Sequence, residues 1–322
     1  MLRKRRYALL LLALAAVLPS VQAQMGKWPV KPVRMIVGLA PGGGVDIMGR
    51  IMAARMSEEF GQQFVVDNRA GAAGMIGADI AAHASPDGYT LTIVGGSYSA
   101  NAALYELSYD PIKDIAPISI IATGPLVFAV HPSVQATNLK EFIDLARAKP
   151  GALAYGSSGV GSTLHLAVEL FRQMTNINIV HVPYKGAGPA LADLMGAHIQ
   201  FIFGSSAPTF QQIKAGHLRG IAVTSAHRAP AMPNLPAIGE VVPGYAMDAW
   251  YSMWAPAGTP GAIVSRLNQS IARILKEPDM LERLHTDGME PAHSTPEEYA
   301  KVLAQEIAKW SKVVKDGNIK VY

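Results

Sequence analysis

Met35-Ile-Val-Gly-Leu-Ala-Pro-Gly-Gly-Gly-Val-Asp-Ile-Met-Gly-Arg50 contains the pattern from which the architecture of this chain follows. It predicts a buried strand over Val33–Leu39, a glycine turn over Pro41–Gly44 and a helix that begins near Val45. The glycines leave bare backbone where the strand ends and the helix begins, so a small solute can approach free N–H groups. The positive end of the helix dipole favours an anion there. A tight turn that binds nothing is the alternative for this stretch taken alone.

A second glycine loop, within Tyr155–His165, favours an anion site for both loops. Its sequence, Gly156-Ser-Ser-Gly-Val-Gly161-Ser162-Thr163, is close to a phosphate-binding P-loop, but Ser162 stands where that motif requires lysine. Without the lysine the charge of the β- and γ-phosphates is not neutralised, which argues against an NTPase. Backbone donors and hydroxyls at a helix N-terminus suit a less charged anion such as a carboxylate. Ser162 is also a good helix N-cap, and the two roles are compatible.

The excess positive charge lies in the first residues of the chain. The 322 residues carry a formal net charge of +4, and the four basic residues at positions 3–6 account for it, because 24 basic and 24 acidic residues remain. This balance gives no reason to expect a nucleic-acid partner. The basic segment, an apolar run over 8–18 and the small residues of Val21-Gln-Ala23 predict a signal peptide at residues 1–23. A retained membrane anchor is the alternative, although the apolar run is short for a span.

The sequence contains no cysteine, so it has no lipid-attachment cysteine, no disulfide and no thiolate metal site. Its nine histidines show no paired spacing typical of a metal site, and we expect neither a metal nor a cofactor. After cleavage near Ala23 we expect an exported, monomeric protein in the periplasm that begins near Gln24.

Strand and helix patterns alternate through the rest of the chain, which predicts an α/β fold with parallel sheets and right-handed crossovers. A helix is predicted over Ala72–Ala84, and Gly95-Gly-Ser-Tyr98 predicts another open loop at the carboxyl end of a strand. Two short apolar runs, Ile115–Thr123 and Leu126–Val130, flank Gly124-Pro125. We interpret this break as the first crossing into another lobe.

A second alternating set follows, including a helix predicted over Thr163–Thr175, until a proline-rich segment, His227–Tyr251, interrupts the periodicity. We expect this segment to return the chain to the first lobe. The prediction is therefore two lobes, residues 24–123 with 251–322 and residues 124–250, with two parallel-type sheets and a ligand cleft between them. A late helix carries an apolar stripe typical of core packing. Its residues are Tyr299, Leu303, Ile307 and Trp310.

His165 is predicted in the first turn of the helix after the second glycine loop. A catalytic histidine needs a nucleophile and an orienting acid, and no G-x-S-x-G elbow occurs in the sequence. The loops around Ser97 and Ser206 both lack the final glycine of that motif. We therefore interpret His165 as a packed, hydrogen-bonded side chain and predict no catalytic residue.

Three other side chains fall close to the predicted loops. Asp46 lies in the first turn of a helix, where an acid is stabilising but would repel an anionic ligand. We expect Asp46 to hold the loop backbone or to accept a hydrogen bond from a ligand hydroxyl, amine or water. Tyr184, at a strand end, is predicted to line the site. Lys185 could supply a cation near the cleft, although most lysines are simply solvated.

A series of short motifs occurs in a specific order along nearly the whole chain after residue 24. They are Trp28-Pro-Val-Lys-Pro-Val-Arg, Ala40-Pro-Gly-Gly-Gly-Val-Asp46, Asp67-Asn-Arg-Ala-Gly71, Pro86-Asp-Gly-Tyr-Thr90, Ala103-Leu-Tyr-Glu, Tyr109-Asp-Pro-Ile-Lys-Asp114, Gly156-Ser-Ser-Gly, His165-Leu-Ala, Val180-His-Val-Pro-Tyr-Lys-Gly186 and Trp254-Ala-Pro-Ala-Gly-Thr-Pro260. In this order the sequence resembles the substrate-binding proteins of tripartite tricarboxylate transporters, the Bug family of periplasmic solute receptors.

The resemblance implies a type II periplasmic-binding fold in which two loops, here Ala40–Asp46 and Ser157–Thr163, pinch a ligand carboxylate through backbone groups, hydroxyls and waters. One departure concerns the strand over Ile199–Phe203, after which the family often has an acid or amide and this chain has Gly204-Ser205-Ser206. A contact to a ligand amine there is thus in doubt. The residues predicted to bind ligand are Ala40, Pro41, Gly42, Gly43, Asp46, Ser97, Ser157, Ser158, Gly161, Ser162, Thr163, Tyr184, Gly204 and Ser205.

The function that these features favour is a receptor that delivers a small organic acid to membrane transporter subunits. A secreted α/β hydrolase or transferase is the alternative, and it lacks the nucleophile–base pair such an enzyme needs. A regulatory effector domain of the same fold would need a DNA-binding module in place of the leader. Composition and loops predict export, the α/β class and an anion site, whereas the transporter role follows from the resemblance alone.

Overall fold

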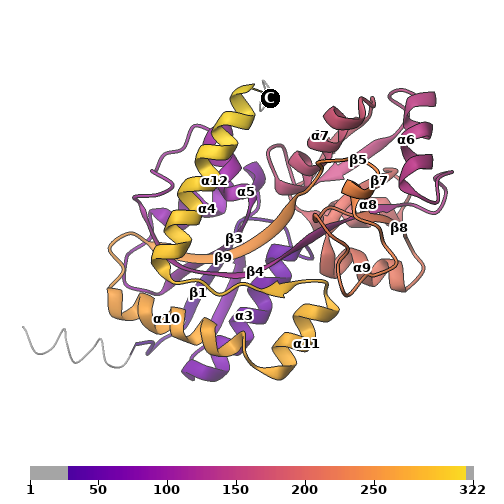
Figure 1. The fold of residues 1–322 in the computed structure, drawn as a ribbon. Helices are drawn as coiled ribbons and strands as arrows, with labels where there is room; N and C mark the ends of the chain where they lie inside the picture. The colour runs from indigo at the N-terminus through magenta and orange to yellow at the C-terminus, as the bar shows by residue number, and fades with distance from the viewer. Residues whose placement is uncertain (1–27, 317–322) are drawn as a thin grey trace, which may run out of the picture.

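Two β-sheets that share one long strand divide the molecule into two lobes (Figure 1). The computed structural model describes residues 28–316, with side chains through residue 312, so the predicted signal peptide lies outside the described residues. The first sheet runs in the order β2, β1, β3, β9, β4 and the second in the order β4, β7, β5, β6, with β8 also paired to β4. The strands are β1 (Val33–Val37), β2 (Phe64–Asn68), β3 (Thr90–Gly95), β4 (Ile115–Val130), β5 (Ala154–Ser157), β6 (Val180–Pro183), β7 (Phe201–Ser205), β8 (Arg219–Val223), β9 (Asp248–Pro256) and β10 (Glu290–Pro291).

The sheet of the first lobe lies between two layers of helices. Because side chains alternate along a strand, Met35 and Val37 of β1 pack into one layer and Ile36 packs into the other. β1 is parallel to both β2 and β3, so these three carboxyl ends lie at the same edge of the sheet. The helices are α3 (Gly44–Phe60), α10 (Gly261–Ile274) and α11 (Pro278–Thr286) on one face, and α4 (Met75–Ala82), α5 (Ser97–Leu104) and α12 (Pro296–Asp316) on the other.

The second lobe repeats this arrangement around an aromatic core. The ring of Phe128 on β4 lies 4.6 Å from that of Phe203 on β7 and 4.7 Å from that of Phe142 on a covering helix. Burial of such large side chains is the main favourable contribution to the lobe's stability. Helices α6 (Leu139–Ala148) and α7 (Thr163–Thr175) cover one face, and α8 (Ala187–Met195) and α9 (Ser206–Lys214) cover the other.

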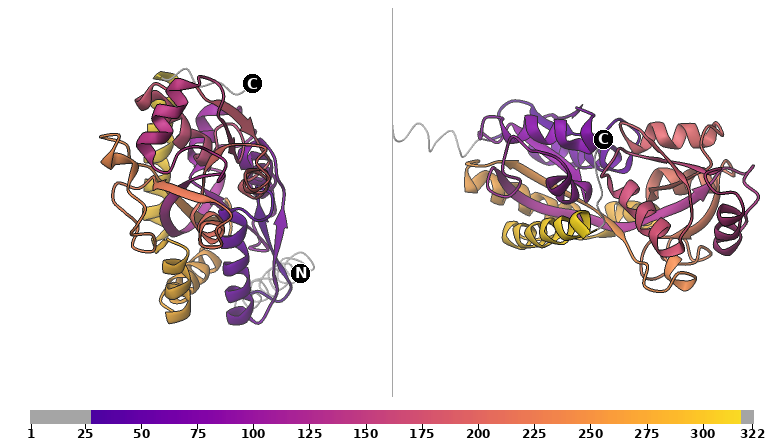
Figure 2. Two further views of the ribbon diagram at one scale, coloured as in Figure 1. Left: turned by 90° about the vertical axis from the view of Figure 1, so that its right-hand side faces the viewer. Right: turned by 90° about the horizontal axis from the view of Figure 1, so that it is seen from above.

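The break expected at Gly124-Pro125 is absent, because β4 runs without interruption from Ile115 to Val130. Residues 115–125 of this strand pair with β9 in the first sheet, and residues 126–130 pair with β7 and β8 in the second. Pro125, which has no N–H to donate, lies where the strand changes partners. A Gly-Pro pair that reads as a turn is thus accommodated at a junction between sheets. The view from above in Figure 2 shows a long strand that passes from one lobe into the other.

Two local expectations also differ from the structure. The loop expected over residues 95–98 is helical from Ser97 onward, because only Gly96 separates β3 from α5. The helix expected over Ala72–Ala84 begins at Met75, after a 3₁₀ turn in which Ala72 and Ala73 have φ values of 45° and 51°. Left-handed residues cannot continue a right-handed helix.

Most other elements lie close to their predicted positions, and the two-lobed α/β architecture is confirmed. Helix α7 has the predicted bounds, and Tyr299, Leu303 and Ile307 of α12 pack into the core as expected. Both sheets are mixed rather than purely parallel, because β4 runs antiparallel to its neighbours. The lobe boundaries at residues 123/124 and 250/251 stay a prediction. Within residues 28–316, no helix has the length and apolar character needed to cross a bilayer.

Candidate functional site

Five helices of the described chain begin around one small cavity between the lobes. The cavity has a volume of about 30 Å³, which is close to the space of one water molecule or one carboxylate group. A helix N-terminus presents unpaired N–H groups and a positive dipole end, so this convergence favours an anion. The lining residues at the helix starts are Gly44 of α3, Ser97 of α5, Thr163 of α7, Ala187 of α8 and Ser205, the N-cap of α9.

Three hydroxyl groups of the lining are available to a ligand. The side chains of Ser97, Ser158 and Thr163 are buried, and their hydroxyls make no hydrogen bond to another residue that the structure describes. Tyr251 also lines the cavity, and burial raises the pKa of its phenol to about 12 although a hydrogen bond with the Ser205 side chain acts in the opposite direction. A bound carboxylate would therefore meet hydroxyl donors as well as backbone N–H groups.

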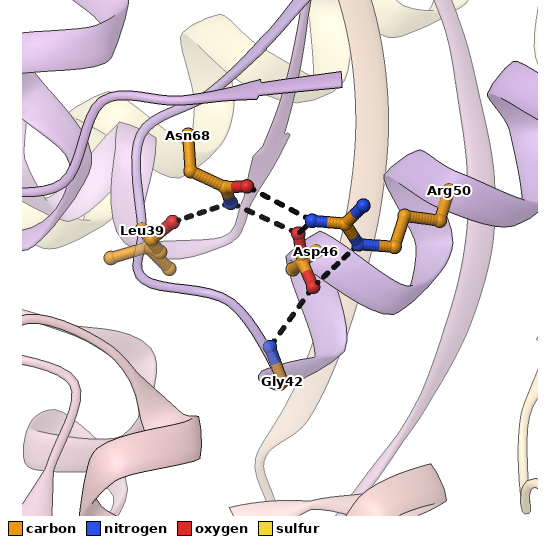
Figure 3. A network of polar contacts seen from close by, with 5 residues as sticks. All are labelled: Leu39, Gly42, Asp46, Arg50 and Asn68. Carbon is orange, nitrogen blue, oxygen red and sulfur yellow. Dashed lines mark hydrogen bonds and ion pairs between the residues drawn. The ribbon is translucent and has the colours of Figure 1, made fainter. Parts of the chain in front are cut away.

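Asp46 is the only acid among the described residues that line the cavity, and its charge is already matched (Figure 3). Its Oδ2 accepts hydrogen bonds from the Gly42 backbone N–H at 2.9 Å and from Arg50 Nε at 3.0 Å. Its Oδ1 accepts from Asn68 Nδ2 at 2.9 Å and lies 3.0 Å from Arg50 Nη2. Asn68 also donates to the Leu39 carbonyl at 2.9 Å, so the network ties the glycine turn to β2 and α3.

The electrostatics of Asp46 favour its charged form. Burial by itself raises the pKa of this carboxyl, but the hydrogen bonds from Arg50, Gly42 and Asn68 and the Arg50 charge lower it below its ordinary value. The paired carboxylate can then hold the turn without repelling an anionic ligand as strongly as a bare charge would. The first of the two roles expected for Asp46, holding the loop backbone, is the one the structure displays.

The two lobes touch around the cavity through backbone groups. The Ala40 N–H donates to the Lys185 carbonyl at 3.0 Å, and the Tyr105 hydroxyl donates to the Val160 carbonyl at 2.9 Å. Glycine is required where the first turn meets α8, because a Cβ on Gly188 would lie 2.2 Å from the Pro41 carbonyl oxygen. Ala40, Pro41 and Gly42 therefore contact the opposite lobe rather than the cavity.

The predicted site residues thus fall into two groups. Those that line the cavity are Gly43, Asp46, Ser97, Ser158, Thr163 and Ser205. Ser162 caps α7 by accepting from the His165 N–H at 3.2 Å, and Tyr184 donates to Asp193 at 2.5 Å. Gly204 lies within β7 against Thr209. The residues placed around the cavity, but outside its lining, are Ala40, Pro41, Gly42, Ser157, Gly161, Ser162, Tyr184 and Gly204.

Two stacked histidines, His165 and His181, contact the second glycine loop. The rings of His165 and His181 lie 4.2 Å apart, and Tyr155 stacks on His181 at 4.8 Å. The Gly161 N–H donates to His165 Nδ1 at 3.1 Å, so this nitrogen must be unprotonated. Burial lowers the pKa of His165, and burial together with the neighbouring His165 lowers that of His181 to about 4. The loop is therefore held by a neutral imidazole pair.

Ser157 and His181 are close enough to suggest a nucleophile and its base. Ser157 Oγ lies 2.7 Å from His181 Nε2, but the side chain is fully buried. The same hydroxyl donates to the Gly159 carbonyl and accepts from the Gly159 N–H, both at 3.1 Å. These contacts give Ser157 a structural role in the loop. Among the described residues, no group of three or more histidine or acidic side chains lies together as metal ligands would.

Comparison with known families identifies the kind of protein to which this site belongs. The family described as the tripartite tricarboxylate transporter family receptor matches residues 48–319. The chain belongs to this family. Its sequence is 33% identical to protein BugT of Bordetella pertussis (strain Tohama I), over 91% of this chain and 91% of that protein. The family consists of receptors and is not a class of enzymes.

Solved structures support the fold of this tripartite tricarboxylate transporter family receptor. The R. palustris protein Rpa4515 with adipate has a TM-score of 0.88 and 38% sequence identity, covering 91% of this chain and 99% of that chain. MatC (Rpa3494) from Rhodopseudomonas palustris with bound malate has a TM-score of 0.84 and 29% identity, covering 89% and 100%. The expected two-lobed fold of the periplasmic binding proteins is thus confirmed.

Part of the receptor's cavity was not predicted from the sequence. Leu126 of β4 and Ala249, Trp250 and Tyr251 of β9 line it from the strands that join the lobes. No local motif marks these residues, since they belong to ordinary apolar strands. Gly96 also lines the cavity, and the glycine pair at 95–96 after a strand was a signal for it. Lys185 has an exposed side chain and contributes its carbonyl instead.

Proposed function

We propose that this receptor captures a small organic acid by one carboxylate and presents it to the membrane subunits of a tripartite transporter. The observation that carries the proposal is the convergence of five helix N-termini on a single cavity. Three unengaged hydroxyls and the pairing of Asp46 with Arg50 add donors and remove a repulsive charge. Such a site binds a carboxylate because charge-assisted hydrogen bonds are about twice as strong as neutral ones.

The similar proteins support a carboxylate ligand. Rpa4515 was solved with adipate and MatC with malate, and both ligands carry carboxylates. Their TM-scores of 0.88 and 0.84 extend over nearly the whole of those chains, so the same two-lobed frame is in place around this cavity. We infer that the carboxylate contacts Ser97, Ser158 and Thr163.

Export, closure and oligomeric state complete the proposal. We infer that residues 1–23 are removed during export to the periplasm and that the mature receptor is a monomer without a nucleic-acid partner. The lobes close over the ligand by rotation about the two segments that join them, near Gly124 in β4 and near Trp250 in β9. The direct contact between Ala40 and Lys185 supports the closed state as the one described here.

A hydrolase or transferase is the weaker alternative. Its nucleophile would be Ser157 beside His181, and the hydroxyl of this serine is buried and engaged in the loop. Ser157→Ala would abolish an enzymatic activity. In a receptor, the same substitution would reduce the stability of the loop and weaken ligand binding.

Titration calorimetry tests the proposed function directly. Protein stripped of ligand by unfolding and refolding is titrated with adipate, with malate and with adipamide, which is uncharged but has a similar shape. We expect saturable binding of at least one acid, no binding of adipamide, and a smaller radius of gyration in small-angle scattering when the acid is bound. Equal binding of adipamide and adipate would exclude a carboxylate site, and an unchanged radius would exclude closure.

A further inference from the structure

A second, larger cavity lies beside the carboxylate cavity. Its lining includes residues of α7 in the second lobe and of α12 in the first, two helices that are labelled in Figure 1. Its volume is about 430 Å³, within the range of small-molecule sites. Leu166 and Leu170 of α7, Met247 and Trp250 near the junction and Trp310 of α12 give it an apolar lining. We refer to it as the α7–α12 groove.

The two cavities share part of their wall. Gly96, Thr163 and Trp250 line both of them. Gly96 belongs to the first lobe and Thr163 to the second, so opening of the lobes would separate these two residues. The shared wall is closely packed at Gly96, since a Cβ on this residue would lie 3.0 Å from Trp250 Nε1 and 3.4 Å from Thr163 Oγ1.

The small cavity is too small to hold a whole organic acid. At about 30 Å³ it accommodates a carboxylate group, and the remainder of any ligand needs another space. The α7–α12 groove is the space that adjoins it, and its apolar lining suits a hydrocarbon chain. The distal end of a ligand would then meet the charged side chains of the groove.

Those charged side chains are mostly paired with one another. Glu169 lies 2.8 Å from Arg172 and accepts from the Tyr155 hydroxyl at 2.8 Å. Glu306 lies 3.1 Å from Lys309 and accepts from Trp310 Nε1 at 3.1 Å. Lys309, the only lysine or arginine among the described residues of the lining, is thus committed to Glu306 and also lies 5.5 Å from the centre of the Trp310 ring.

Asp248 is the exception among the charges that line the groove. No lysine, arginine or histidine side chain that the structure describes lies within ion-pair distance of it, and none of its carboxylate oxygens accepts a described hydrogen bond. Asp248 is exposed in the groove, and the desolvation that it does undergo raises the pKa of this carboxyl. An anionic group entering the groove would meet an acid without a counter-ion, whereas a cation would complete the pair.

We propose that the α7–α12 groove holds the distal end of the ligand and that Asp248 selects a distal ammonium group over a second carboxylate. The preferred ligand class is then a carboxylate with an apolar spacer and a terminal amine. This inference rests on the proposed function, because the other end of the ligand is the carboxylate bound at the helix N-termini.

Three six-carbon acids test the selection, since adipate, hexanoate and 6-aminohexanoate differ only at carbon six, which is a carboxylate, a methyl and an aminomethyl group respectively. Calorimetry at low salt is expected to give the tightest binding for 6-aminohexanoate and the weakest for adipate. The expected difference between these two is about three- to tenfold in Kd, as for a partly exposed charge pair. The order of affinity among the three acids is measured on the unmodified protein, so this test does not require any variant to fold.

Asp248→Asn keeps the shape of the side chain and removes its charge. We expect this variant to bind 6-aminohexanoate and adipate within about twofold of each other, because the attraction and the repulsion both vanish. Glu282→Gln, an exposed position on α11 outside the groove lining, removes the same charge from the protein and is the matched control. It should leave the preference unchanged.

The outcomes separate this inference from the proposed function. Tighter binding of adipate than of 6-aminohexanoate, or an unchanged preference in Asp248→Asn, would overturn the selection by Asp248. Neither result would contradict the proposed function as a carboxylate receptor. Failure of all three acids to bind, together with failure of malate, would overturn the carboxylate receptor itself.

Discussion

The backbone N–H of Gly44 donates to Ser205 Oγ across 3.3 Å, joining residues that are 161 positions apart in the chain. Gly44 begins α3 in the first lobe, and Ser205 ends β7 in the second. The Tyr251 hydroxyl also lies close to Gly44, since a Cβ on Gly44 would be 2.2 Å from this hydroxyl oxygen. One helix N–H at the cavity is thereby used to hold the lobes together.

Gly44→Ala should destabilise the protein and weaken ligand binding. The added methyl would clash with the Tyr251 hydroxyl and approach Ser205 Oγ to 2.9 Å. Overpacking of this kind lowers the free energy of unfolding by about 1–3 kcal/mol. Urea unfolding and calorimetry measure the two effects. Gly261→Ala is the matched control, since Gly261 also begins a helix and a Cβ on it would have no atom within 4 Å. Equal stability of the two variants would contradict the contact.

Asp46→Asn should loosen the first glycine turn. An amide cannot accept from Gly42, Arg50 and Asn68 as a carboxylate does, so at least one of these donors loses its partner beside the buried Asp46 side chain. We expect a loss of about 1–3 kcal/mol in the free energy of unfolding, together with weaker ligand binding. Asp67→Asn is the control, because Asp67 is also ion-paired, with Arg34 and Arg69, but is more exposed. The free energy of unfolding of Asp67→Asn should fall by less than about 1 kcal/mol.

Thr163→Val keeps the shape of the side chain and removes one hydroxyl from the cavity. Loss of a charge-assisted donor should raise the Kd for a carboxylate by about ten- to a hundredfold, or about 1.5–3 kcal/mol. Thr175→Val at the other end of α7 removes a hydroxyl that donates to the Phe171 carbonyl and should leave affinity unchanged. A Lys185→Ala variant more damaging than Thr163→Val would place the carboxylate elsewhere.

Stability should fall as the pH is lowered from about 6.5 toward 4. Burial lowers the pKa of His165, and burial with the adjacent ring lowers that of His181 to about 4, so in this range the unfolded chain binds protons that the folded protein does not. Unfolding in urea at several pH values measures the slope.

His181→Asn should reduce the slope, whereas His198→Asn, an exposed position, should not. Protonation of His165 would also remove the acceptor for the Gly161 N–H, so ligand affinity should decline over the same pH range. An affinity that stays constant down to pH 4.5 would show that the loop does not depend on the neutral imidazoles.

Local patterns predicted the elements that have strong periodicity and clear ends. Helix α7 was predicted from the serine cap and apolar spacing that define it, and the glycine turn before α3 was predicted from three consecutive glycines. Helix α5 was missed because its eight residues, Ser-Tyr-Ser-Ala-Asn-Ala-Ala-Leu, have little apolar periodicity. The continuity of β4 was missed because its Gly-Pro pair has the composition of a turn, and only pairing with different strands on each side makes it a junction.

The amino-acid order was enough to establish the α/β class, the two glycine loops and the tendency of each loop to attract an anion, because these depend on neighbouring residues. Folding in three dimensions decided that five helix starts meet at one cavity and that Ser157 turns away from it toward His181. It also decided that Asp248 lines a groove in which no described side chain is its counter-ion. These features depend on contacts between residues that are far apart in the chain. No local pattern contains the distances between such residues, so they appear only when the two lobes are assembled around their shared strand.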